Sequence, residues 1–116
     1  MIRGFSLIAI GALLALTATQ TFAAGDPANG KTKVATCVAC HGQDGNAVDP
    51  QYPRLAGQYA DYLARAMHEY KTGKRANPIM QGFVKTLSDQ DIEDISAYFA
   101  TMPTKLQGLE NHIQGE

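Results

Sequence analysis

Two cysteines and a histidine stand close together in the stretch TCVACHGQDG. They are Cys37, Cys40 and His41, and the 116-residue chain contains no other cysteine. If this stretch forms a helical turn, the i, i+3, i+4 spacing places two thiols and one imidazole on the same face. These side chains can then hold a single object between them.

A covalently attached haem explains this spacing best. Each thiol can form a thioether with one vinyl group of the porphyrin while the imidazole reaches the iron, and Cys-x-x-Cys-His is typical of that attachment. A structural zinc site needs four protein ligands, and a thioredoxin-like redox pair needs a βαβ unit, for which the sequence shows no strands. A disulfide would suit an exported protein but would leave the histidine without a role. We therefore predict one haem c, bound through Cys37 and Cys40, with His41 as an iron ligand.

The iron needs a second axial ligand, for which the sequence offers Met67, Met80, Met102, His68 and His112. Met67 belongs to an apolar helical stripe, where a methionine usually fills the core. Met80 lies between Pro78 and Gly82 in a segment that we predict to be a loop able to close over the opposite face of the haem. A thioether favours reduced iron and raises the reduction potential. Met80 is therefore the predicted ligand.

The N-terminal residues are typical of a secretory signal peptide. A short positive start is followed by an apolar run from Phe5 to Leu16 and by small residues up to Ala23. The apolar run is shorter than the ~20 residues of a membrane-spanning helix. We expect cleavage near Ala23, removal of residues 1–23, and a soluble periplasmic protein whose mature chain has no membrane span.

Residues 24–116 are predicted to form a single domain, with a polar C-terminal tail from about residue 103. A core of this size alone gives little stability, so a covalent staple or a bound group is expected. The formal net charge is −1, and nothing in the charge pattern indicates a nucleic-acid partner.

The apolar pattern and the capping residues predict three main helices. Asp26-Pro27 is a start signal for a helix that runs into the Cys37 region. A stripe at helical spacing between Tyr59 and Tyr70 is ended by Gly73. Ser88, with Asp91 three residues later, caps a helix that stops before Pro103. The segments 42–56 and 74–87, rich in glycine, proline, asparagine and aspartate, are predicted to be long loops.

The chain strongly resembles class I c-type cytochromes, in particular the short bacterial periplasmic ones and the single-haem halves of di-haem relatives. The resemblance covers nearly all of the mature chain and rests on motifs in the right order: CVACHG (37–42), YPRLAGQ (52–58), YKTGKR (70–75), PIMQG (78–82) and LSDQDIEDISAYFA (87–100). It implies an all-α, small cytochrome c fold with three main helices and long loops wrapped around one haem. The first and last helices should cross at Gly30.

The resemblance also implies roles for residues around the haem. The carbonyl of Pro53 should accept a hydrogen bond from the ring nitrogen of His41 that faces away from the iron, and so raise the basicity of the imidazole. Leu55 should pack on the haem. Gln58 and Arg75 are similar to family positions near the haem propionates.

Ligands on both faces of the iron leave no open site for a substrate. We therefore expect an electron carrier rather than an enzyme, with redox proteins as partners, either as a monomer or as a weak dimer. The alternative is a haem subunit held on a periplasmic dehydrogenase, and a peroxidase or gas sensor is less favoured. Partners are expected to dock at an uncharged patch made of Val38, Ala39, Ile79, Gln81, Gly82 and Phe83.

Overall fold

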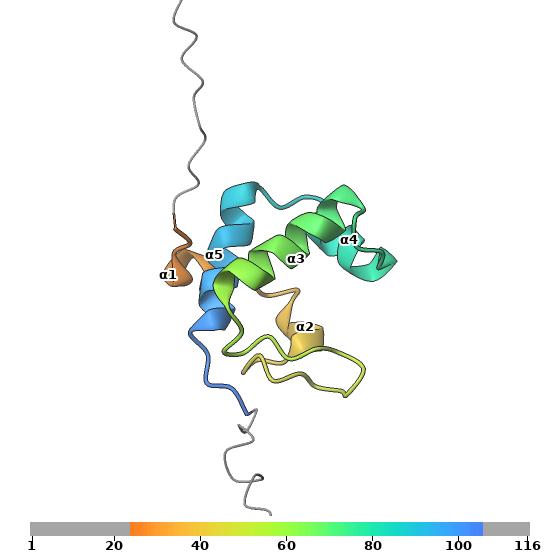
Figure 1. The fold of residues 1–116 in the computed structure, drawn as a ribbon. Coiled ribbons are helices and arrows are strands. Elements are labelled where there is room, and N and C mark those ends of the chain that lie inside the picture. Colours follow the sequence, from red (N-terminus) through yellow and green to blue (C-terminus); the bar gives the residue numbers. More distant parts are fainter. Residues whose placement is uncertain (1–23, 106–116) are drawn as a thin grey trace, which may run out of the picture.

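The computed structural model describes residues 24–105, which form helices and no strands. The predicted signal peptide and the residues after 105 lie outside the described part of the chain. The helices are α1 (Pro27–Lys33), α2 (Val38–His41), α3 (Ala60–Thr72), α4 (Pro78–Val84) and α5 (Asp89–Ala100). Figure 1 shows α3 lying between α5 and α4, and both α1 and α3 pack against α5. Within residues 24–105, no helix is long and apolar enough to cross a membrane.

Helix α1 starts where the sequence predicts but ends earlier. The side chain of Asp26 accepts a hydrogen bond from the amide of Ala28, and Pro27 occupies the first turn. The helix stops at Lys33 instead of running to Cys37. The carbonyl of Val34 then accepts hydrogen bonds from Cys37 and Val38, so the chain turns and restarts as α2.

Helix α3 ends, and helix α5 begins, at the residues that the sequence predicts. Gly73 follows α3 in a left-handed conformation with φ 77°, and its amide donates a hydrogen bond to the carbonyl of Tyr70. Residues with a side chain adopt this conformation less readily than glycine. At the start of α5, Ser88 and Asp91 form the predicted capping box. Both helices are therefore fixed by local signals at these ends.

The prediction of one long loop over residues 74–87 is wrong, because residues Pro78–Val84 form helix α4. The side chain of Asn77 accepts hydrogen bonds from the amides of Ile79 and Met80, and Pro78 occupies the first turn. These are the same signals that start α1. Gly82 lies within the helix, where a glycine is tolerated at a modest cost. Met80 is therefore presented by a short helix rather than by a loop.

Glycines allow α1 and the segment that leads into it to lie directly on the backbone of α5. A Cβ atom on Gly30 would lie 2.0 Å from the carbonyl oxygen of Asp94, and one on Gly25 would lie 2.0 Å from that of Glu93. Neither position has room for a side chain. The predicted crossing of the first and last helices at Gly30 is confirmed.

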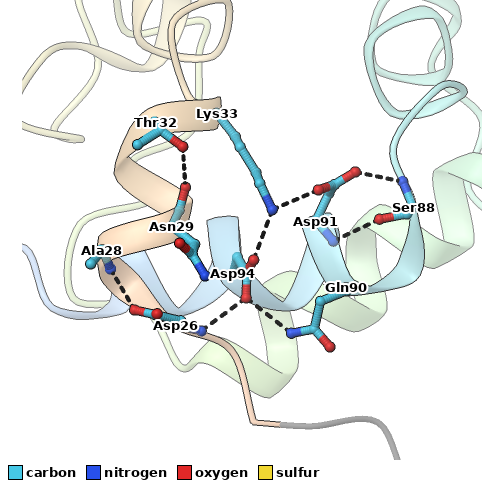
Figure 2. A network of polar contacts seen from close by, with 9 residues as sticks. All are labelled: Asp26, Ala28, Asn29, Thr32, Lys33, Ser88, Gln90, Asp91 and Asp94. Atoms are coloured by element: carbon cyan, nitrogen blue, oxygen red, sulfur yellow. Dashed lines mark hydrogen bonds and ion pairs between the residues drawn. The ribbon is translucent and has the colours of Figure 1, made fainter.

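A polar network centred on Asp94 joins α1 to α5 (Figure 2). Asp94 is only 2% exposed, and its carboxylate accepts from the amide of Asp26 (2.9 Å), from Lys33 Nζ (2.8 Å) and from Gln90 Nε2 (3.0 Å). Lys33 also pairs with Asp91 at 2.7 Å. The hydrogen bond from Asp26, followed by that from Lys33, lowers the pKa of Asp94 to about 2. The buried charge is therefore fully paired.

A second polar anchor holds residues 103–105 against the loop that follows α2. Asn46 is buried, and its Nδ2 atom donates to the carbonyls of Asp44 (2.9 Å) and Pro103 (3.1 Å). Its Oδ1 atom accepts from the amide of Lys105 at 2.8 Å, and Lys105 also pairs with Asp44. The first residues of the predicted polar tail are thus fixed in place.

The apolar core lies where α1, α3 and α5 meet. Its buried members are Val34, Val38, Leu63, Ile95 and Phe99. Cys37, Leu55 and Met67 are partly buried and pack against this cluster, so the core continues without a break into the region of the cysteine motif.

Candidate functional site

A cavity of about 460 Å³ lies between α2, α3, α4 and the loop that joins α2 to α3. Every residue that the sequence predicts to contact the haem lines it: Cys37, Cys40, His41, Pro53, Leu55, Gln58, Arg75 and Met80. Most of the other lining side chains are apolar or aromatic. The fold therefore gathers one set of sulfur, nitrogen and apolar groups around a single space.

The cysteine motif forms the predicted helical turn. Cys37 precedes α2 with a helical backbone, and its carbonyl accepts hydrogen bonds from Cys40 and from His41. Both cysteines are free thiols and half-buried, and burial raises the pKa of the Cys37 thiol. The two sulfurs are not joined in a disulfide, and both line the cavity.

The imidazole of His41 is buried and held by a backbone carbonyl. Its Nδ1 atom lies 2.8 Å from the carbonyl oxygen of Pro53, and the residue is 6% exposed. A carbonyl oxygen can only accept, so Nδ1 carries the proton and the lone pair is left on Nε2. This tautomer is the one that a metal requires at Nε2.

Two methionines line the cavity. Met80 contributes from α4, and Met67 contributes from α3 while also packing on the core, so the expectation that Met67 only fills the core is incomplete. The other predicted alternatives lie elsewhere: Met102 packs on the core without lining the cavity, and His68 lies 3.8 Å from Asp89. His112 is outside the described residues.

Arg75 places a positive charge at the wall of the cavity. Its guanidinium lies over the rings of Tyr62 (6.0 Å) and Tyr70 (5.4 Å), and its Nε atom lies 3.5 Å from the carboxylate of Glu69. Hydrogen bonds to Tyr62, and then to Tyr70, raise the pKa of Arg75. The aromatic rings therefore hold a cation beside an apolar space.

The sequence prediction missed the aromatic side chains that complete the cavity. Tyr52, Tyr62, Tyr70 and Phe83 all line it. Tyr62 and Tyr70 belong to the apolar stripe of α3, from which only a helix was predicted. That stripe faces the cavity as well, and its aromatic content is a signal that could have identified these residues.

The predicted docking patch needs one correction. Val38 was expected at the surface, but it is buried, with only 9% of its surface exposed. It is the first residue of α2 and belongs to the core cluster with Leu63 of α3 and Phe99 of α5. Ala39 is exposed, and Ile79 and Phe83 are 63% and 46% exposed. The uncharged surface therefore consists of Ala39 together with α4.

Comparison with known proteins assigns the family. Residues 27–103 match the family model for cytochrome c. The chain belongs to the cytochrome c family. It is 50% identical over 96 residues to cytochrome c4 of Pseudomonas aeruginosa, a match that covers 81% of this chain and 48% of that protein. It is also 46% identical over 81 residues to cytochrome c-554(548) of Halomonas halodenitrificans, covering 67% of this chain and 98% of the relative. The chain thus spans about half the length of the cytochrome c4 relative.

A solved structure supports the same conclusion for the fold. Reduced recombinant cytochrome c4 from Pseudomonas stutzeri aligns with a TM-score of 0.68 and 42% identity, over 72% of this chain and 48% of that one. The predicted all-α, small cytochrome c fold is therefore confirmed, although the predicted first helix is divided into α1 and α2 and α4 is an additional helix.

The lining of the cavity fits the haem c that this family carries. Two free thiols flank a buried imidazole whose Nε2 lone pair is available, and apolar side chains surround them. As a cytochrome c, the chain carries one covalent haem, attached through Cys37 and Cys40.

Proposed function

We propose that this chain is an electron carrier in which His41 and Met80 are the axial ligands of the haem iron. The observation that supports this most directly is that an imidazole from α2 and a thioether from α4 line the same cavity. The haem supplies an iron that changes its charge by one electron. The protein residues hold that iron, shield it from water and set how readily it is reduced.

The remaining lining residues are proposed to bind and orient the haem. The carbonyl of Pro53 fixes the proton on His41 Nδ1 and makes the imidazole a stronger ligand. Leu55 presents an apolar surface to the porphyrin. Arg75 and Gln58 offer a guanidinium and an amide to the haem carboxylates, and the aromatic rings beside Arg75 keep its charge in place.

An iron with two protein ligands has no free position, so we propose that the chain is not an enzyme. Carbon monoxide tests this. The exported holoprotein should take up one electron per haem in a redox titration, and its reduced form should not bind carbon monoxide rapidly. Met80→Ala provides the positive control, because it should open the iron to carbon monoxide. Rapid binding by the unmodified protein would instead support a gas sensor or a peroxidase.

We further propose that the protein is periplasmic and meets redox proteins through the uncharged surface formed by Ala39, Ile79 and Phe83. Transient redox complexes have small interfaces and must release their partners quickly. Ala39→Glu should therefore slow electron exchange with a physiological partner and leave the haem spectrum unchanged. A matched pair of changes, Lys71→Glu with Lys74→Glu, probes the end of α3. If only that pair slows exchange, the docking surface lies there instead.

The alternative role is a haem subunit held on a larger periplasmic dehydrogenase. Gel filtration of native periplasm separates the two roles, because a free carrier elutes as a monomer or weak dimer. Elution of all the haem-stained chain at a much larger size would favour the subunit role.

A further inference from the structure

Tyr52 lies against the ring of His41. It belongs to the loop between α2 and α3, where its amide donates to Asp49 at 3.0 Å, and its side chain is half-buried. The two ring centroids are 6.5 Å apart, and the planes are inclined at 65°, an edge-to-face arrangement. Such pairs are favoured because the positive edge of one ring faces the negative face of the other.

The position of Tyr52 in the loop supports this contact. Its neighbour Pro53 accepts the hydrogen bond from His41, so adjacent residues hold the imidazole through a carbonyl and a ring. Tyr52 also lines both the haem cavity and a shallow outer groove formed by residues 46–50 and 52–54. It is therefore part of the wall that separates the imidazole from the surrounding water.

We propose that Tyr52 is a positioning residue for His41: its ring packs against the imidazole and restrains it. This inference rests on the proposed haem ligation, but only on the His41 side.

Two variants test the role of the ring. Tyr52→Leu removes the ring, so the exported holoprotein should exchange the Nδ1 proton of His41 several-fold faster, as followed by NMR of the reduced protein. Tyr52→Phe keeps the ring and should exchange this proton at the rate of the unmodified protein. Tyr59→Leu is the control, because Tyr59 is 78% exposed and does not line the cavity.

Unchanged proton exchange in Tyr52→Leu, or equally fast exchange in Tyr52→Phe, would overturn the proposal. Equally fast exchange in Tyr59→Leu would also overturn it, because the effect would then not be specific to Tyr52. These readouts concern the histidine side of the haem. The carbon monoxide test concerns the Met80 side, so either proposal can fail alone.

Discussion

The Nδ1 atom of His41 lies 2.8 Å from the carbonyl oxygen of Pro53, a residue 12 positions further along the chain. The proline ring fixes its own φ angle, so the acceptor is carried by a stiff part of the loop. The hydrogen bond sets the tautomer of the imidazole and increases the electron density at Nε2. The loop thereby acts on the electronic properties of the ligand.

Replacing Pro53 with glycine should loosen this acceptor. Pro53→Gly keeps the carbonyl but frees the backbone, so we expect a higher reduction potential from a weaker hydrogen bond and a stability loss of about 0.4–1 kcal/mol. Voltammetry and thermal unfolding of the holoprotein measure the two effects. Pro50→Gly, in the same loop, should reproduce the stability loss without the change in potential. An equal change in potential in both variants would contradict the role of the carbonyl.

Met80 and Met67 both line the cavity, and mutation distinguishes their roles. Met80→Ala should abolish the weak far-red absorption of an iron–sulfur bond and lower the reduction potential. Met67→Leu is close to an isosteric core change, so it should keep that band and cost less than ~1.5 kcal/mol. Loss of the band in Met67→Leu, with a normal spectrum for Met80→Ala, would assign the ligand to α3.

Features that depend on a few adjacent residues could be predicted from the sequence. The capping box of Ser88 and Asp91, the left-handed Gly73 and the helical turn from Cys37 to His41 each follow from neighbours in the chain. The cavity lining could be inferred as a set only through the family resemblance, because the spacing of Pro53 or Arg75 alone carries no such signal.

Features that depend on packing were missed. Asn77-Pro78 offers the same start signal as Asp26-Pro27, but the glycine, proline and asparagine in residues 74–87 favoured a loop. In the structure α4 forms there and packs against α3. Val38 was placed on the surface because its helix was predicted without the neighbours that bury it. Tyr52 stands in a recognised motif, yet its contact with His41 exists only once the loop folds back.

The network around Asp94 predicts how stability depends on acid. The pKa values of Asp94 and Asp91 are both lowered from 3.8 to about 2. Since the folded values lie below the unfolded ones, this contribution is present above pH 4 and is lost as the pH falls from about 4 to 2. Asp94→Asn should be less stable at neutral pH, and its melting temperature should fall less steeply between pH 4 and 2. Asp61→Asn, which changes an exposed residue of α3, is the control, and its melting temperature should fall as steeply as that of the unmodified protein. If the melting temperature of Asp94→Asn also fell as steeply, the network would not be the cause of the acid sensitivity.

Asn46 and Ser96 are both buried but differ in their partners. Asn46→Ala should cost about 1–3 kcal/mol, because it leaves the amide of Lys105 and the carbonyl of Pro103 without their partner. Among the described residues, the hydroxyl of Ser96 has no hydrogen-bond partner, so Ser96→Ala should be neutral or stabilising. Denaturant unfolding of the two holoproteins measures both, and a larger loss for Ser96→Ala would show a missing partner for its hydroxyl.

The contact of Gly25 and Gly30 with the backbone of α5 restricts how this protein can vary. Any side chain at either site would meet a carbonyl oxygen that belongs to the helix itself, so no change of rotamer elsewhere can make room. The polar residues around Asp94 can be exchanged in compensating pairs, but a lost glycine can be compensated only by moving α1 away from α5. In a library containing every single substitution, these two glycines should therefore tolerate almost none, although neither of them lines the cavity.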